Sequence, residues 1–184
     1  MSTERPVIKE NHLVLSALGQ DRPGLVDELS RAILDSGGNI VDSRMTVLGG
    51  DFAIILLVSG QWNSIVKLEN ALPVLQQKLG MTFTARRTSE REKKADNVPY
   101  AVDVVALDHP GIVYNLAHFF SVRNINIEEM VTNRYAAAHT GAPMFSVHIS
   151  VGIPSSMHIA ALRDEFMSFC DELNLDAVIE PIKG

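Results

Sequence analysis

The sequence predicts an α+β protein made of two tandem copies of a βαββαβ unit. Three observations predict this fold: a short motif occurs twice, apolar residues recur in a constant register, and strand-like stretches alternate with helix-like ones. The chain has 184 residues, of which 46% are hydrophobic and 21% are charged. This length and composition allow two small domains, each with a core of its own.

The repeated motif is a loop with the pattern Asp-x-Pro-Gly. Residues 18–25 read LGQDRPGL and residues 107–112 read LDHPGI, which places the two Asp residues 87 positions apart. The apolar positions after each loop keep that spacing up to Ile40 and Ile127. The spacing then grows to 93 at Phe52 and Phe145, so the second copy has a longer loop before its third strand. The constant register indicates an internal duplication.

Within the first copy, residues 12–18 (HLVLSAL) form an apolar run that predicts a strand. Leu25, Leu29 and Ile33 follow at helical spacing, and the glycines after Ser36 end this helix. The remaining predicted elements are strands over 40–48 and 51–59 around a Gly49-Gly50 turn, a helix from about residue 63, and a last strand over 81–84.

Pro73 lies inside the second predicted helix of the first copy. A proline inside a regular helix removes a backbone hydrogen bond and clashes with the preceding turn, at a cost of about 3 kcal/mol. We therefore expect a kink or break near residues 71–73.

The boundaries follow from composition. We expect a first domain over residues 1–86, a charged linker over 87–98 and a second domain over 99–184. The stretch RRTSEREKKADNV at 86–98 is rich in charge, which is typical of a solvated linker. Binding of an acidic partner or of nucleic acid is the alternative interpretation.

The two helices of such a unit cover only one face of its sheet. The other face and the sheet edge need a partner, which a second unit or a second chain can supply. We expect the two copies to pack on each other and the whole chain to form a homodimer.

The formal net charge of −6 disfavours a broad basic face for nucleic acid. The single cysteine, Cys170, lies in the apolar phase of a predicted helix, which indicates core packing. The first ten residues, MSTERPVIKE, lack the apolar region of a signal peptide, and no apolar run approaches the roughly 20 residues of a membrane span. These observations predict a cytoplasmic protein.

Motifs of catalysis are absent from the sequence. No nucleophile-elbow, phosphate-loop, dinucleotide or paired-cysteine pattern occurs. The adjacent pair Asp108–His109 is not repeated, because Arg22 follows Asp21 in the first copy. We predict that the protein is not an enzyme and has no catalytic residues, metal or cofactor. No pair among the six histidines has metal-ligand spacing: His12, His109, His118, His139, His148 and His158.

The repeated loop has two interpretations from its chemistry. As a helix start, it needs Asp21 or Arg22 as a cap and Pro23 in the first turn. As a binding site, the free N–H groups of the helix start hold a carboxylate while the neighbouring Asp holds an ammonium group, which together suit a free amino acid. Asn39 and Asn126 open the following strand of each copy, where their amides are either turn residues or contacts to the same ligand.

These residues resemble a known family. A βαββαβ unit with Asp-x-Pro-Gly after its first strand, and GGNI or NINI before its second, resembles the ferredoxin-like ACT domain, a small regulatory module that senses amino acids. The segments HLVLSALGQDRPGLVDEL, GGNIVDSRM and FAIILLVSGQWNSI resemble the glycine cleavage system transcriptional repressors. The second copy is looser, because His109 replaces the usual Arg and the 134–144 loop is longer.

The resemblance implies a repressor without a DNA-binding domain of its own. Such a protein binds a DNA-bound LysR-type activator, and glycine relieves the contact. By position, the resemblance also assigns the ligand to the two loops and the starts of the next strands, at an interface between domains. The residues carried over are Gly19, Gln20, Asp21, Arg22, Pro23, Gly24, Asn39 and Ile40 in the first copy and Asp108, His109, Pro110, Gly111, Asn126 and Ile127 in the second.

Two further functions stay open at this point. The protein is either such an amino-acid-responsive regulator, an ACT-repeat interaction module that senses nothing, or a regulatory subunit of an amino-acid or folate-metabolism enzyme. A likeness in fold does not separate these three.

Overall fold

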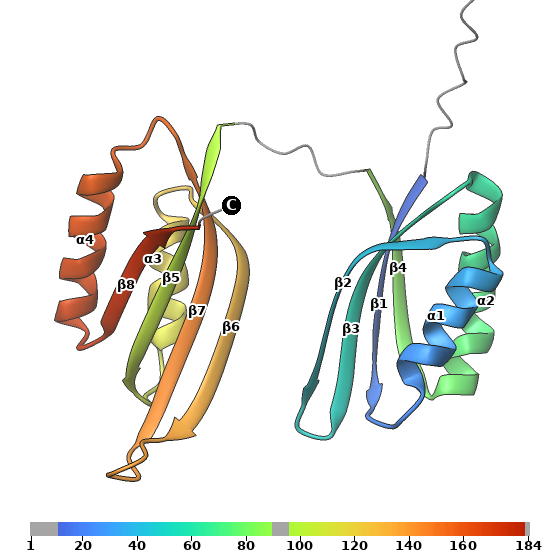
Figure 1. Ribbon diagram of the computed structural model, residues 1–184, viewed down its shortest axis with the longest axis horizontal. Helices are drawn as coiled ribbons and strands as arrows, with labels where there is room; N and C mark the ends of the chain where they lie inside the picture. The colour runs from blue at the N-terminus through green and yellow to red at the C-terminus, as the bar shows by residue number, and fades with distance from the viewer. Residues whose placement is uncertain (1–10, 90–95, 183–184) are drawn as a thin grey trace, which may run out of the picture. The chain divides into compact units, whose positions relative to one another are not determined.

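The computed structural model describes residues 11–89 and 96–182 of the chain (Figure 1). The chain divides into two compact units, residues 1–92 and 93–184, called unit 1 and unit 2 below. Among the described residues, no helix has the length and apolar character needed to cross a membrane.

Each unit has the predicted order βαββαβ, which confirms the α+β fold class. Unit 1 consists of β1 (Asn11–Gln20), α1 (Leu25–Asp35), β2 (Asn39–Leu48), β3 (Asp51–Gly60), α2 (Trp62–Leu79) and β4 (Met81–Thr88). Unit 2 consists of β5 (Asn97–Leu107), α3 (Ile112–Ser121), β6 (Asn126–Ala136), β7 (Pro143–Pro154), α4 (Ile159–Glu172) and β8 (Asp176–Pro181).

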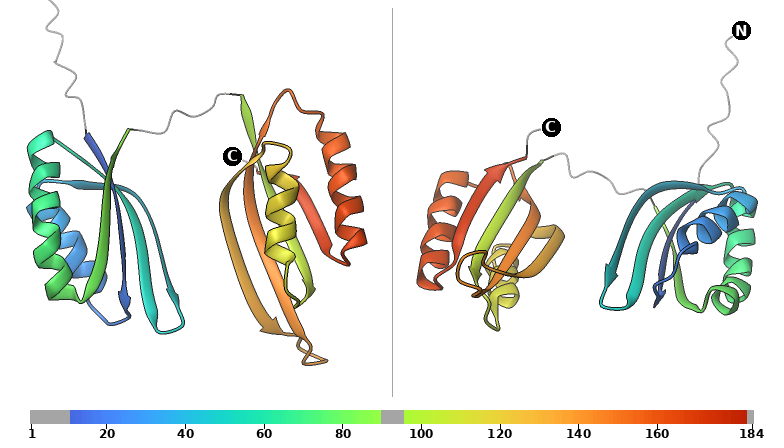
Figure 2. Two further views of the ribbon diagram at one scale, coloured as in Figure 1. Left: turned by 180° about the vertical axis from the view of Figure 1, so that it is seen from behind. Right: turned by 60° about the horizontal axis from the view of Figure 1, so that its bottom comes forward.

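Both sheets are antiparallel and have equivalent strand orders, β2-β3-β1-β4 and β6-β7-β5-β8. Figure 2 shows that the two helices of each unit lie on the same face of its sheet. Alternate residues of β1, such as Leu13 and Leu15, are fully buried under the helices, whereas Leu18 on the opposite face is 55% exposed. The helices of each unit therefore cover only one face of its sheet, as the sequence predicted.

Each unit has a separate hydrophobic core, and the two cores differ in chemistry. The core of unit 1 is mostly aliphatic, with Leu, Ile and Val from both helices and two strands, β1 and β3. The core of unit 2 contains a cluster of stacked and edge-to-face rings, Phe119, Phe120, Phe166 and Phe169, with centroids 5.0–6.5 Å apart. Cys170 is fully buried beside them, and this burial raises the pKa of its thiol to about 12.

The expected break at Pro73 is wrong, because α2 continues through it to Leu79. Ile65 and Leu68 before the proline and Leu75 after it are buried in the core. Burying a large apolar side chain stabilises by roughly 1.5–3 kcal/mol, so the packing on both sides outweighs one lost helical bond.

Both strands that border the predicted linker are longer than expected. Residues 86–88 belong to β4 and pair with residues 12–14 of β1, and Asn97 already belongs to β5. A bidentate ion pair between Arg87 and Glu69 of α2, at 2.7 and 2.9 Å, explains why a charged stretch continues as a strand. The middle of the predicted linker, residues 90–95, lies outside the described residues.

Candidate functional site

The two Asp-x-Pro-Gly loops have the same backbone design. In unit 1 the N–H of Asp21 donates to the carbonyl of Gly50 (3.0 Å), and in unit 2 the N–H of Asp108 donates to the carbonyl of Pro143 (2.9 Å). Gly50 and Pro143 occupy equivalent places at the start of β3 and β7. Each loop is therefore fastened to the adjacent hairpin at the same point.

The helix start differs from the prediction in both units. The N-cap is the glycine, Gly24 at φ 92° and Gly111 at φ 99°, and neither helix has a side-chain cap. This left-handed conformation suits glycine, because a Cβ is strained there. The expected cap at Asp21 or Arg22 is wrong, and Pro23 lies before the helix, outside its first turn. The side chains of Asp21 and Asp108 therefore do not cap the helices.

The described cations around the loop of unit 1 pair with Glu28 and not with Asp21. Arg22 pairs with Glu28 at 3.1 Å, and Lys78 approaches the other oxygen of Glu28 at 3.2 Å. The hydrogen bonds from Arg22 and Lys78 lower the pKa of Glu28. Asp21 is exposed, and its carboxylate has no hydrogen bond or ion pair to any residue that the structure describes.

The loop of unit 2 has the opposite arrangement. The Nε of Arg134, from β6, lies 2.8 Å from a carboxylate oxygen of Asp108. Nδ1 of His109 lies 3.0 Å from the carbonyl of Pro110, so it contributes nothing to Asp108. The two loops thus have the same backbone conformation, but only the aspartate of unit 2 has a cationic partner among the described residues.

Asn39 and Ile40 do not join Asp21 within one unit. Asn39 pairs with Ser59 at one end of the sheet, whereas the Asp21 loop follows Gln20, which pairs with Asp51 at the other end. The eight residue steps along β1 from His12 to Gln20 span roughly 26 Å at about 3.3 Å each. Asn126 and Ile127 are equally far from Asp108 in unit 2. A single unit therefore provides only half of the expected site.

Gly19 has a structural role. A Cβ on it would lie 2.9 Å from Cγ of Met81 and 3.0 Å from the carbonyl oxygen of Gly80. The close approach of β1 to the start of β4 therefore requires glycine here.

Comparison with known proteins decides the family. The profile of the ACT domain matches residues 11–86. The glycine cleavage system transcriptional repressor of Escherichia coli K12 is 32% identical over 173 residues, which cover 94% of this chain and 91% of that protein. This chain belongs to the ACT-domain family of that repressor.

Two solved structures extend the likeness to the whole ACT-repeat fold. A crystal structure described as a candidate glycine cleavage system transcriptional repressor has a TM-score of 0.72 at 28% identity, covering 96% of this chain and 99% of that one. An unknown protein from Galdieria sulphuraria has a TM-score of 0.77 at 28% identity, covering 95% and 100%. The chain is a regulatory ACT protein with two ferredoxin-like domains in tandem.

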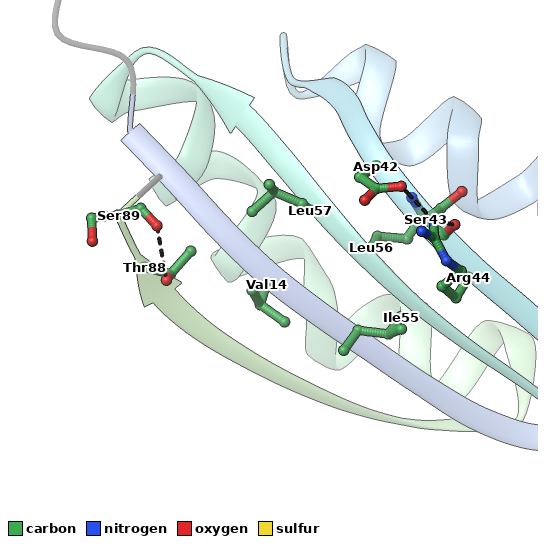
Figure 3. A pocket seen from close by; sticks show the side chains of 9 residues that line it. All are labelled: Val14, Asp42, Ser43, Arg44, Ile55, Leu56, Leu57, Thr88 and Ser89. Atoms are coloured by element: carbon green, nitrogen blue, oxygen red, sulfur yellow. Dashed lines mark hydrogen bonds and ion pairs between the residues drawn. The ribbon is translucent and has the colours of Figure 1, made fainter. Parts of the chain in front are cut away.

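A second feature of the first ACT domain is a hollow of about 260 Å³ on the open face of its sheet (Figure 3). Its floor is apolar, and two of its lining residues, Arg44 and Asp42, form an ion pair at 2.6 Å. None of the predicted ligand residues lines it. The hydrogen bonds from Arg44 and from the Ser43 amide hold the pKa of Asp42 below its usual value, so this carboxylate is already balanced. The lining residues are Val14, Asp42, Ser43, Arg44, Ile55, Leu56, Leu57, Thr88 and Ser89.

The second ACT domain contains one close histidine–carboxylate contact on its open face. Nδ1 of His148 lies 2.7 Å from Asp103, and both side chains are about half exposed. The described parts of the chain contain no cluster of three or more metal-ligating side chains. This contact was not predicted from the sequence, because residues 103 and 148 are far apart in the chain and come together only through the pairing of β5 with β7.

Proposed function

We propose that this ACT-repeat protein is an amino-acid-responsive repressor that binds a DNA-bound LysR-type activator, with glycine as its ligand. The observation that supports this most directly is the Asp21 carboxylate in the loop before α1, which no described residue balances. The full-length similarity to a glycine cleavage system transcriptional repressor supports the regulatory part of the proposal. We also propose that the protein acts in the cytoplasm and catalyses no reaction.

The loop of unit 1 has the two charges that a free amino acid needs. The first helical hydrogen bond of α1 runs from Glu28 to Gly24, so the three preceding N–H groups of the helix have no intrahelical acceptor. These N–H groups suit the ligand carboxylate, and Asp21 suits its ammonium group. Asp27 and Glu28 do not repel the carboxylate strongly, because each has a cationic partner, Arg31 at 3.8 Å and Arg22 at 3.1 Å.

The missing half of the site requires a second copy of the chain. Strand β2 is an edge strand, and all ten of its residues are exposed. A long exposed edge with apolar side chains, here Val41, Met45 and Val47, is a template for pairing with another strand. We propose that β2 pairs with β2 of a second chain, which gives the homodimer.

The sequence of β2 is self-complementary in one antiparallel register. Pairing centred on Ser43 sets Asp42 opposite Arg44 of the second copy, twice by symmetry, and Val41 opposite Met45. The same register sets Asn39 opposite Val47 of the second copy. Val47 pairs with Phe52, and Phe52 pairs with Gly19, so Asn39 of one chain lies level with the Asp21 loop of the other.

Charge reversal tests this dimer. Asp42→Arg sets like charges against each other at two symmetric places and should weaken the dimer about tenfold, since exposed pairs contribute roughly 0.2–1 kcal/mol each. The double variant Asp42→Arg/Arg44→Asp restores opposite charges and should recover the dimer. Sedimentation equilibrium measures both. A double variant as weak as the single one would contradict the register.

The test of the function is a gel-shift experiment with a LysR-type activator bound to its promoter fragment. The protein should supershift the activator–DNA complex, glycine should release it, and the protein alone should not shift the fragment at physiological salt. Asp21→Asn should supershift, but its release should need about tenfold to a hundredfold more glycine. A specific shift by the protein alone would contradict the partner-mediated mechanism. A supershift that ignores glycine in the native protein would leave only a protein-interaction role.

A further inference from the structure

The two ACT domains differ at one position that bears directly on the ammonium half of the site. Val47 in β2 pairs with Phe52, and Arg134 in β6 pairs with Phe145 at the equivalent place. Both positions lie at the end of the sheet where the Asp-x-Pro-Gly loop leaves the first strand. Unit 1 thus presents an apolar side chain beside its loop, and unit 2 presents a guanidinium.

Arg134 already satisfies the carboxylate of its loop. Its Nε lies 2.8 Å from Asp108, and only 27% of the Asp108 side chain is exposed. A charge-assisted N–H donor at this distance makes the same kind of contact that a ligand ammonium would make. The guanidinium of Arg134 therefore occupies the place beside Asp108 that the ammonium group of a ligand would take.

Among the residues of unit 1 that the structure describes, no cation pairs with Asp21. Arg22 is the nearest cation in sequence to Asp21, but its guanidinium points to Glu28 (3.1 Å) and to the carbonyl of Pro23 (3.3 Å). Unit 2 lacks this arrangement, because Asn115 stands where unit 1 has Glu28, and His109 stands in place of Arg22. Because Arg22 pairs with Glu28, its guanidinium does not neutralise the carboxylate of Asp21.

We propose that Arg134 closes the loop of unit 2 to ligand, so that each chain binds one amino acid, at the loop of unit 1. Val47 and Arg134 are then the residues that decide which copy binds. This inference rests on the proposed amino-acid function. It goes beyond that function by assigning the binding copy, the stoichiometry and the side chain responsible.

Calorimetric titration of the full-length protein with glycine tests the inference through stoichiometry. The native protein should bind one glycine per chain. Arg134→Val, which gives unit 2 the residue of unit 1, should bind two. Val47→Arg, which gives unit 1 the residue of unit 2, should bind glycine at least tenfold more weakly than the native protein. Loss of the Asp21 contact alone predicts at least a tenfold weaker affinity, because a hydrogen bond to a charged group contributes roughly 1.5–3 kcal/mol.

Two conservative variants control for charge and for folding. Arg134→Lys keeps the cation beside Asp108 and should still bind one glycine per chain, and Val47→Leu keeps the apolar contact and should also bind one. Circular dichroism checks that every variant is folded. Two sites in the native protein, or one site in folded Arg134→Val, would overturn the inference while leaving the proposed function standing. No binding to the native protein at all would overturn both.

Discussion

The two loops of this protein share a backbone and differ in charge. Both are fastened to a hairpin by the aspartate N–H, and both start a helix at a glycine with positive φ. In unit 1 the carboxylate of Asp21 has no partner among the described residues, whereas Arg134 neutralises Asp108 in unit 2. The duplication has therefore kept the frame of the site, and the substitutions around that frame set its charge balance.

The cores of the two units extend this comparison. Unit 1 has an aliphatic core and an unbalanced loop, whereas unit 2 has a ring cluster and an internally neutralised loop. Each cluster draws all its residues from its own unit. A substitution in one core therefore removes contacts within its own unit alone.

The largest effect is expected in the ring cluster. Phe166→Ala removes a fully buried ring that contacts Phe119 and Phe120, and should destabilise unit 2 by about 3–5 kcal/mol. Alkylation of Cys170 reports this, because the buried thiol with a pKa of about 12 reacts only after unit 2 opens. Labelling should become much faster in Phe166→Ala. Leu68→Ala, which is equally buried in unit 1, is the matched control and should leave the labelling rate unchanged.

The next effect concerns the two aspartates. Asp21→Asn should weaken glycine binding about tenfold to a hundredfold, because a charge-assisted hydrogen bond contributes roughly 1.5–3 kcal/mol, while stability changes little. Asp108→Asn should leave glycine affinity unchanged and remove only a partly exposed ion pair, which contributes about 0.2–1 kcal/mol. Calorimetry and denaturant unfolding measure the two quantities. Equal losses of affinity in both variants would remove the distinction between the loops.

A smaller and symmetric effect is expected at the helix starts. Gly24→Ala and Gly111→Ala should each destabilise their own unit by about 1–2 kcal/mol, because an L residue is strained at these φ angles. A Cβ at either position would make only ordinary van der Waals contacts, none closer than 3.8 Å, so backbone strain accounts for the loss. Hydrogen exchange resolved by unit measures each loss. A large inequality between the two variants would show that the shared backbone frame is not equivalent after all.

The smallest effect is a pH dependence confined to unit 1. The pKa of Glu28 is lowered from 4.5 by its hydrogen bonds to Arg22 and Lys78. Its contribution to the stability of unit 1 is therefore present above pH 4.5 and lost as the pH falls through the lowered value. Glu28→Gln should remove that part of the acid dependence. Unit 2 has Asn115 at this place, so hydrogen exchange there should show no counterpart.

The fold was predictable because duplication and periodicity are both visible in the chain. The spacing of Leu25, Leu29 and Ile33 marked a buried helix face, and the Gly49-Gly50 turn marked a hairpin; the structure confirms both. The break expected at Pro73 was wrong because the low helix propensity of proline does not account for the core packing of the residues on both sides of it. The end of β4 was missed because its charge is balanced by Glu69, which lies in another element.

The site was less predictable than the fold, for reasons of geometry. The loop at Asp21 was found from its motif, but its glycine cap was not, because Asp and Pro are both common helix starters. The position of Asn39 follows from strand direction, because the antiparallel pairing places Asn39 at the end of the sheet opposite the Asp21 loop. The contact of Arg134 with Asp108 has no sequence signal at all.

The most direct test of the account is a calorimetric titration of the native protein with glycine, with serine and alanine as comparison ligands. The account predicts saturable binding of glycine, one molecule per chain, and much weaker heats for the other two. No saturable heat with any of the three amino acids would contradict it, because the Asp21 loop would then be a helix start and nothing more.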